Sequence, residues 1–176
     1  MKIACLGWGS LIWKPAALPL RGDWQKDGPL FPIELCRVAD GGELSTAICP
    51  DAAPLPVLWA WLAVDNLEQA CAALADREQI PAARTDGVGR LRVSGTHGGP
   101  LHQWATARQI DAVVWTALPP RYADTEGRLP ALSEAVDYLA GLNGDTRAHA
   151  LSYVRQLAAQ IDTPYRRAIS HSLGLD

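Results

Sequence analysis

The length of the longest apolar run in the chain, residues 57–64, limits which structural elements this sequence can form. Eight residues are far fewer than the roughly 20 that cross a bilayer as a helix, but they match a β-strand buried on both faces. We therefore expect a central strand here and no membrane partner. The N-terminus lacks the basic, apolar and small-residue regions of a signal peptide, so the sequence predicts a cytoplasmic protein.

The other local patterns indicate mainly strands before residue 120. A short strand at 2–6 ends in a glycine-containing loop, and a hairpin at 33–39 and 44–48 turns at the Gly41–Gly42 pair. Further strands are expected near 91–93 and at 109–117. The proline-rich stretch 14–32 has no regular period and is expected to be irregular, and the segment 87–100 is expected to hold strands joined by mobile turns.

Helical periodicity is confined to one internal segment and the C-terminal part. Apolar residues recur at helical spacing after Asp65, which forms a D-x-x-E capping arrangement with Glu68. Later helices are predicted at 132–139 and at 151–161 behind a possible cap, Asp145, and a short one after the Thr163 cap. Because strands and helices do not alternate, a Rossmann fold is disfavoured. The sequence predicts a mixed α+β domain around a curled sheet.

Composition is typical of one globular domain. The 176 residues are 48% hydrophobic and 20% charged, so the whole chain, 1–176, is interpreted as a single domain with the helical segment 132–173 as an extension. The net charge is −3, and no run of like charge exceeds Arg166–Arg167, which argues against a nucleic-acid partner. The four cysteines are widely spaced and predict buried, reduced thiols: Cys5, Cys36, Cys49 and Cys71.

Neither a metal nor a cofactor is predicted. His97 and His102 fit no familiar ligand spacing and are interpreted as loop residues, whereas His149 and His171 are expected on the surface of helices. Trp59, Trp61 and Trp115 lie in strand-like runs and are expected to pack in the core.

The loop Gly7-Trp8-Gly9-Ser10-Leu11 is the most informative local feature. Two glycines around a bulky aromatic residue allow backbone N–H groups to turn toward one point and bind an anion such as a carboxylate. A plain strand-to-loop turn is the alternative. Ser10 lacks the G-x-S-x-G elbow of a nucleophile and is expected to bond within its own loop. Trp13 and Trp24, in the segment that follows, are expected to lie near this site.

The segment Leu6–Pro15, which contains this loop, resembles the Y-G-S-L-x-W-x-P opening of the ChaC branch of the γ-glutamylcyclotransferase-like proteins, with Trp8 at the tyrosine position. Asp76-Arg77-Glu78 is similar to that family's L-D-x-R-E ending of a later helix. The resemblance covers roughly residues 2–80 and the strand near Val113. It implies a mixed sheet curled into a partial barrel, with substrate held at residues Gly7, Trp8, Gly9, Ser10 and Leu11.

The same resemblance implies that Glu78 is the catalytic residue. Cyclisation of a γ-glutamyl amine or peptide needs a base to take the proton of the substrate's α-amine and no enzyme nucleophile. The expected products are 5-oxoproline and the free amine. Three alternatives stay open: an ordinary ion pair between Glu78 and Arg77, a non-catalytic protein that binds a small carboxylate or amine, and a cysteine-dependent amidase using Cys5 or Cys49. Substrate identity and oligomeric state are left open.

Overall fold

The structure, a computed structural model, describes residues 1–95 and 98–175; the loop histidine predicted at position 97 lies outside these residues. By their internal contacts the described residues divide into two compact units. Unit 1 comprises residues 1–31 and 55–118, and unit 2 comprises 32–54 and 119–176. The single-domain interpretation of the chain stays a prediction.

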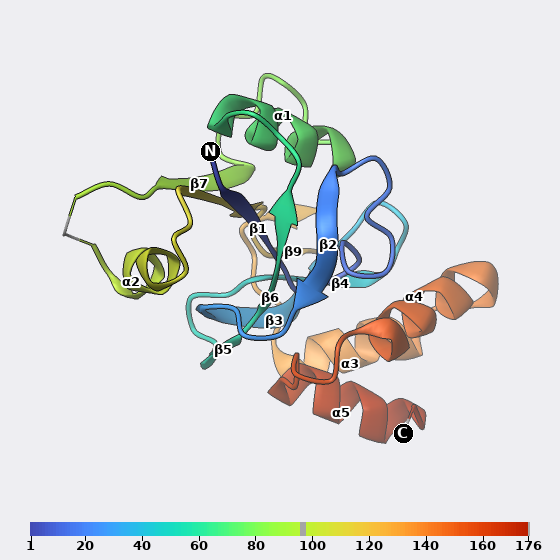
Figure 1. Cartoon of the computed structure of the whole chain (residues 1–176). Coiled ribbons are helices and arrows are strands. Elements are labelled where there is room, and N and C mark those ends of the chain that lie inside the picture. Colours follow the sequence, from blue (N-terminus) through green and yellow to red (C-terminus); the bar gives the residue numbers. More distant parts are fainter. Residues whose placement is uncertain (96–97, 176) are drawn as a thin grey trace. The chain divides into compact units, whose positions relative to one another are not determined.

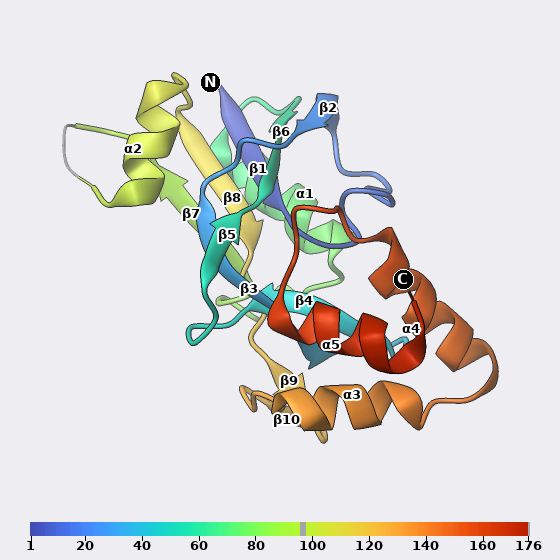
Figure 2. The same ribbon diagram turned by 90° about the horizontal axis from the view of Figure 1, so that it is seen from below.

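Unit 1 is built on a mixed five-stranded sheet (Figure 1), and Figure 2 shows its strand order, β2-β6-β1-β8-β7. β1 pairs antiparallel with β6 on one side and parallel with β8 on the other. The strands and the two helices of this unit are β1 Ile3–Gly7, β2 Leu20–Gln25, β6 Leu58–Leu62, α1 Leu67–Arg77, β7 Val88–Arg92, α2 Pro100–Ala107 and β8 Ala112–Thr116. The two edge strands of this sheet are β2 and β7.

All five residues of β1 are buried. Its inward side chains pack with one face of α1, whose buried residues follow a helical period: Leu67, Ala70, Cys71 and Leu74. The helix begins one residue later than the capping pattern predicts. Asn66 accepts a hydrogen bond from the N–H of Gln69 at 2.9 Å, and Gln69 Oε1 accepts one from the N–H of Asp65 at 2.9 Å. Asn66 thus caps the helix, while Gln69 accepts from the residue before the cap, so these two amides take the place of the predicted pair Asp65 and Glu68.

Unit 2 combines a small sheet with helices (Figure 2). Strand order is β10-β9-β3-β4, and α3 packs against α5. Its elements are β4 Leu44–Ile48, β9 Arg121–Tyr122, β10 Thr125–Glu126, α3 Leu132–Ala140, α4 Gly144–Gln156 and α5 Pro164–Leu173. Two strands, β3 Leu30–Val38 and β5 Pro54–Pro56, run across the boundary between the units. These elements confirm the predicted hairpin and the α+β class.

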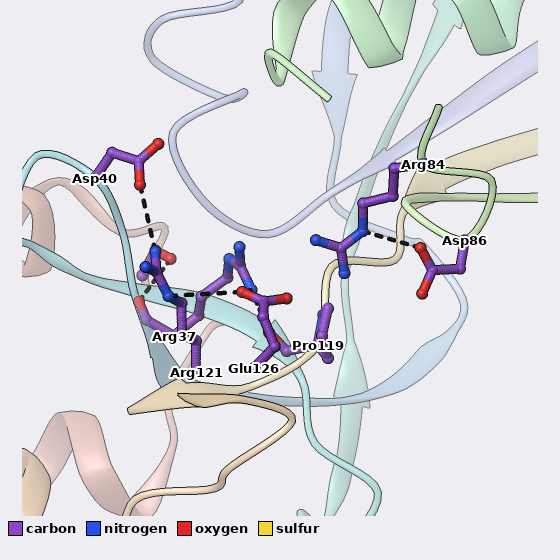
Figure 3. A network of polar contacts seen from close by, with 8 residues as sticks. Arg37, Asp40, Arg84, Asp86, Pro119, Arg121 and Glu126 are labelled. Atoms are coloured by element: carbon purple, nitrogen blue, oxygen red, sulfur yellow. Dashed lines mark hydrogen bonds and ion pairs between the residues drawn. The ribbon is translucent and has the colours of Figure 1, made fainter. Parts of the chain in front are cut away.

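Ion pairs join the sheet strands of unit 2 (Figure 3). Arg37 on β3 contacts Glu126 on β10 at 2.9 Å and donates to the carbonyl oxygen of Pro119 at 2.9 Å. Arg121 on β9 contacts Asp40, in the hairpin turn, at 3.3 Å. The Arg84–Asp86 pair drawn in the same figure belongs to unit 1. Short strands β9 and β10 are therefore held in register by side chains as well as by backbone pairing.

Glu34 is a buried acid that ties β3 to the start of α5. Its side chain accepts hydrogen bonds from the Thr163 hydroxyl at 2.5 Å and from the N–H groups of Leu35 at 2.8 Å and Tyr165 at 3.3 Å. Thr163 also accepts from the N–H of Arg166, which confirms it as the helix cap. Burial raises the pKa of the Glu34 carboxyl although all three hydrogen bonds act in the opposite direction.

Four sequence expectations about elements are wrong. The helix predicted at 151–161 behind Asp145 is α4, Gly144–Gln156, whose N-cap is Asn143. The stretch 14–32 contains β2, an edge strand whose bulge between Arg21 and Gln25 hides its periodicity. The apolar run 57–64 forms β6, but β1 is the central strand, and Trp61 on β6 is only half-buried. The segment after 98 forms α2, which starts at Pro100; its buried face depends on packing within unit 1 rather than on a strong local signal.

Because Glu34 is buried, we predict how the free energy of unfolding depends on pH. In the unfolded chain this group ionises near its ordinary value of 4.5, but in the folded chain it holds its proton to a higher pH. The folded state then binds more protons, so Glu34 lowers the free energy of unfolding as pH rises through its folded pKa. We expect Glu34→Gln to remove that decline, by about 1.4 kcal/mol for each unit by which the pKa is raised.

Urea unfolding between pH 4 and pH 8 measures this difference. Asp51→Asn is the matched control, because Asp51 is an exposed acid of the same unit. The same pH slope in wild type and Glu34→Gln would contradict the prediction.

Candidate functional site

The loop after β1 is a tight turn with unpaired backbone donors. Ile12 donates its N–H to the carbonyl oxygen of Gly9 at 3.1 Å, and Lys14 donates to that of Ser10 at 2.8 Å. The N–H groups of Gly9, Ser10 and Leu11 form no hydrogen bond with any group in the part of the chain that the structure describes. Three successive amides without a protein acceptor are what an anion-binding loop requires.

Arg77 connects this loop to the end of α1. Its guanidinium donates to the Lys14 carbonyl oxygen from Nη2 at 2.7 Å and from Nε at 3.1 Å. Nη2 also donates to Ser10 Oγ at 3.1 Å, and Nη1 contacts Glu78 Oε1 at 3.0 Å. One side chain, 14% exposed, thus brings the predicted loop and the predicted glutamate together. Ser10 bonds to Arg77 rather than to its own loop.

Glu78 stands where α1 stops. Its N–H still bonds to the Leu74 carbonyl oxygen at 3.0 Å, and the next residue, Gln79, has φ +55°, a left-handed conformation that ends the helix. The N–H of Ile80 then bonds to the Ala75 carbonyl oxygen at 2.9 Å, closing the cap. The Glu78 side chain is 18% exposed. This termination holds the carboxylate at the end of the helix, beside the loop that Arg77 contacts.

Cys5 lies in β1 beneath this region and is fully buried. Burial, and secondarily the negative charge of Glu78, raises the pKa of its thiol. Because the thiolate is the nucleophile, a protonated and buried thiol is inert. Cys49, in unit 2, is also buried and unpaired by any disulfide. The structure therefore favours the predicted role of these residues as core thiols over a cysteine-dependent amidase.

Aromatic side chains enclose the loop within unit 1. A Cβ atom at Gly7 would lie 2.7 Å from the Trp24 ring, so Trp24 packs directly on the Gly7 backbone and only glycine fits there. Trp8 is buried and stacks on Phe31 with ring centroids 5.5 Å apart, and Phe31 contacts Trp115 edge-on at 5.6 Å. The Trp8 indole therefore packs with other rings, and what the loop offers a ligand is backbone.

The three histidines that the structure describes take no part in this arrangement. His102, predicted in a loop, lies on α2 and is only 7% exposed. Its Nε2 is 3.2 Å from the Ser94 carbonyl oxygen, a contact that fixes the ring. His149 and His171 are exposed on α4 and α5, as predicted. Within the described residues no three histidine, cysteine or acidic side chains gather as a metal site would need, and no helix there is both long and apolar enough for a bilayer.

Sequence reasoning missed the linking role of Arg77. It considered Arg77 only as the ion-pair partner of Glu78, and that pair is present. The signal was a basic residue in the last turn of α1, where a cation is also favoured by the helix dipole. The contacts of Arg77 with Ser10 and Lys14 span more than 60 residues of sequence and depend on how α1 packs on the sheet.

The crystal structure of a γ-glutamyl cyclotransferase specific to glutathione, from yeast, aligns with 99% of this chain over 99% of its own. The TM-score is 0.46, and 12% of the residues are identical. No protein-family model matches the sequence, and no curated protein matches it.

Removal of the Arg77 side chain should release the loop. Arg77→Ala deletes three hydrogen bonds to the loop and one ion pair, and charged hydrogen bonds of this kind are each worth about 1.5–3 kcal/mol. Because Arg77 keeps some contact with solvent, we expect a total loss of about 1–3 kcal/mol in the free energy of unfolding.

Amide hydrogen exchange tests where that loss acts. Exchange should accelerate at Ile12 and Lys14, whose N–H groups close the turn, and stay slow at Cys5 in β1. Arg90→Ala is the control, since Arg90 forms only an exposed, 3.5 Å pair with Glu68. Equal exchange at Ile12 in the Arg77→Ala and Arg90→Ala variants would show that Arg77 does not hold the loop.

Proposed function

We propose that this protein is a γ-glutamylcyclotransferase-like enzyme that converts a γ-glutamyl amine or peptide into 5-oxoproline and the free amine. The observation that carries this proposal is the Arg77 bridge, which holds the Glu78 carboxylate beside a loop with three unpaired N–H groups. A base and a set of oxyanion donors at one place are the two elements that the reaction needs.

In this proposal the loop binds and orients the substrate. The N–H groups of Gly9, Ser10 and Leu11 hold a substrate carboxylate or the oxygen that becomes negative at the γ-carbonyl. Gly7 permits the close packing of Trp24 and so fixes the direction in which the backbone leaves β1. Trp8 contributes rigidity through its stack on Phe31. Well-oriented intramolecular attack reaches effective molarities of about 10⁵ M or more, so positioning supplies much of the rate.

Glu78 moves the proton. Its carboxylate takes a proton from the substrate's α-amine as the amine nitrogen attacks the γ-carbonyl carbon and the five-membered ring closes. When the tetrahedral intermediate collapses, the bond from the γ-carbon to the departing amine breaks, and Glu78 returns the proton to that nitrogen. No water is consumed, and no covalent enzyme intermediate forms. Arg77, bonded to Oε1, holds the carboxylate in position through the sequence.

The ion pair with Arg77 also favours a second candidate, a protein that binds a small carboxylate or amine without turning it over. In that case Glu78 has a structural role, as Arg77's partner at the end of α1, and the loop amides alone hold the ligand's carboxylate. The two candidates differ in whether Glu78 transfers a proton that is needed to convert the ligand into products.

Substitution of Glu78 distinguishes the enzyme from the binding protein. Glu78→Gln keeps the shape of the side chain but removes the base, and loss of a general base typically lowers kcat by about 10²–10⁴. The assay supplies wild type with glutathione, γ-glutamyl amino acids and γ-glutamyl amines, and follows both 5-oxoproline and the released amine. We expect equal amounts of the two products from wild type and a loss of at least 100-fold in the variant.

Glu68→Gln is the matched control, because Glu68 lies in the first turn of the same helix with a side chain 79% exposed. It should keep wild-type kcat. A Glu78→Gln variant that is folded and keeps more than about half of kcat would exclude Glu78 as the base. If wild type releases no 5-oxoproline but a γ-glutamyl compound raises its Tm, the binding protein is the correct candidate.

A further inference from the structure

A cavity of about 400 Å³ lies in unit 2, between α4 and α5. Its volume is within the range of small-molecule sites, roughly 300–1,000 Å³. The residues that line it come from the last turn of α4, the turn before α5, α5 itself and the residues after it: Val154, Arg155, Asp162, Arg166, Arg167, Ser170 and Leu175. Three of these side chains are guanidinium groups and one is a carboxylate, so positive charge dominates the lining.

Among the described lining residues the one carboxylate is Asp162, and it already forms an ion pair. Asp162 accepts from Arg167 Nη1 at 3.1 Å, and both side chains are exposed, so the pair is weak. The Arg155 side chain forms no hydrogen bond or ion pair with any described residue. The described lining thus has three guanidinium groups and one carboxylate, Asp162, whose ion pair is with Arg167.

Arg166 forms the inner part of the lining and is held rigidly. Its Nη1 donates to the carbonyl oxygens of Ala158 at 2.7 Å and Ile161 at 2.8 Å, and its Nη2 donates to that of Leu157 at 2.9 Å. These acceptors are dipoles without net charge. Burial lowers the pKa of Arg166 because its charge is removed from water, although the negative charge of nearby Asp162 acts in the opposite direction. A guanidinium has five N–H donors, so these three bonds leave donors for a ligand.

We propose that this cavity binds a small oxyanion, a phosphate or a carboxylate, through Arg155, Arg166 and Arg167. Guanidinium groups match the planar fork of a carboxylate and the oxygen pairs of a phosphate, and Arg166 is already oriented by the protein. Ser170 adds a hydroxyl donor to the same lining. The site is in unit 2, whereas Glu78 and its loop are in unit 1, so the two proposed sites are built from different parts of the chain.

Isothermal titration calorimetry at low ionic strength tests this site on the full chain, with inorganic phosphate and succinate as separate probes. We expect saturable binding of at least one probe at one site per chain, with Kd of about 1 mM or tighter. Arg155→Gln and Arg167→Gln should each weaken binding about tenfold, the effect of one charged hydrogen bond. Asp162→Asn should tighten it several-fold, because it removes the competing carboxylate and frees Arg167.

Arg147→Gln is the matched control. Arg147 also donates to backbone carbonyl oxygens at a helix end, those of Leu139, Ala140 and Leu142, but it does not line the cavity. Its variant should bind as wild type does. Binding of phosphate alone identifies the phosphate class, and binding of succinate alone identifies the carboxylate class. Absence of saturable binding to either probe, an equal loss in Arg147→Gln, or no tightening in Asp162→Asn would overturn the proposal.

Discussion

Burial of β1 on both faces is the constraint on which unit 1 depends. The strand is five residues long, none of them exposed, and it pairs with β6 on one side and β8 on the other. A strand in this position has no freedom to slip, because a shift of one residue would reverse every side chain. Residue 7 is thereby fixed at the sheet end, and the loop that follows starts from a rigid point beside α1.

The candidate site is built from that rigid point outward. Gly7 lets the Trp24 ring lie on the backbone, and Arg77 reaches from α1 to the carbonyl oxygen of Lys14. The loop is thus held at its beginning by packing and at its far end by hydrogen bonds, while the amides between remain unpaired. This arrangement favours ligand binding. A loop can offer N–H donors to a ligand only when other contacts hold it in a conformation in which those donors do not bond within the loop.

The sequence predicted the elements whose signals are local. The hairpin with Gly42 at φ +88°, the apolar face of α1 and the Thr163 cap all depend on neighbouring residues, and each is present. β2 and α2 were missed because edge pairing and packing within the unit decide them. For the site, the sequence suggested the loop and Glu78, but Arg77 as the link between them arises only from contacts across more than 60 residues. Whether Glu78 is a base stays a prediction.

The two edge strands of unit 1 carry a further consequence. β2 contains exposed Arg21 and Asp23 around Gly22, which has φ +81° and lies at the bulge, and β7 exposes Arg90 and Arg92. Unpaired strand edges recruit other chains, and charged side chains together with bulges are the usual protection. Repulsion between arginines on approaching β7 edges, and the twisted backbone of β2, therefore oppose growth of this sheet from molecule to molecule. The same residues that obscured β2 in the sequence give the sheet its resistance to aggregation.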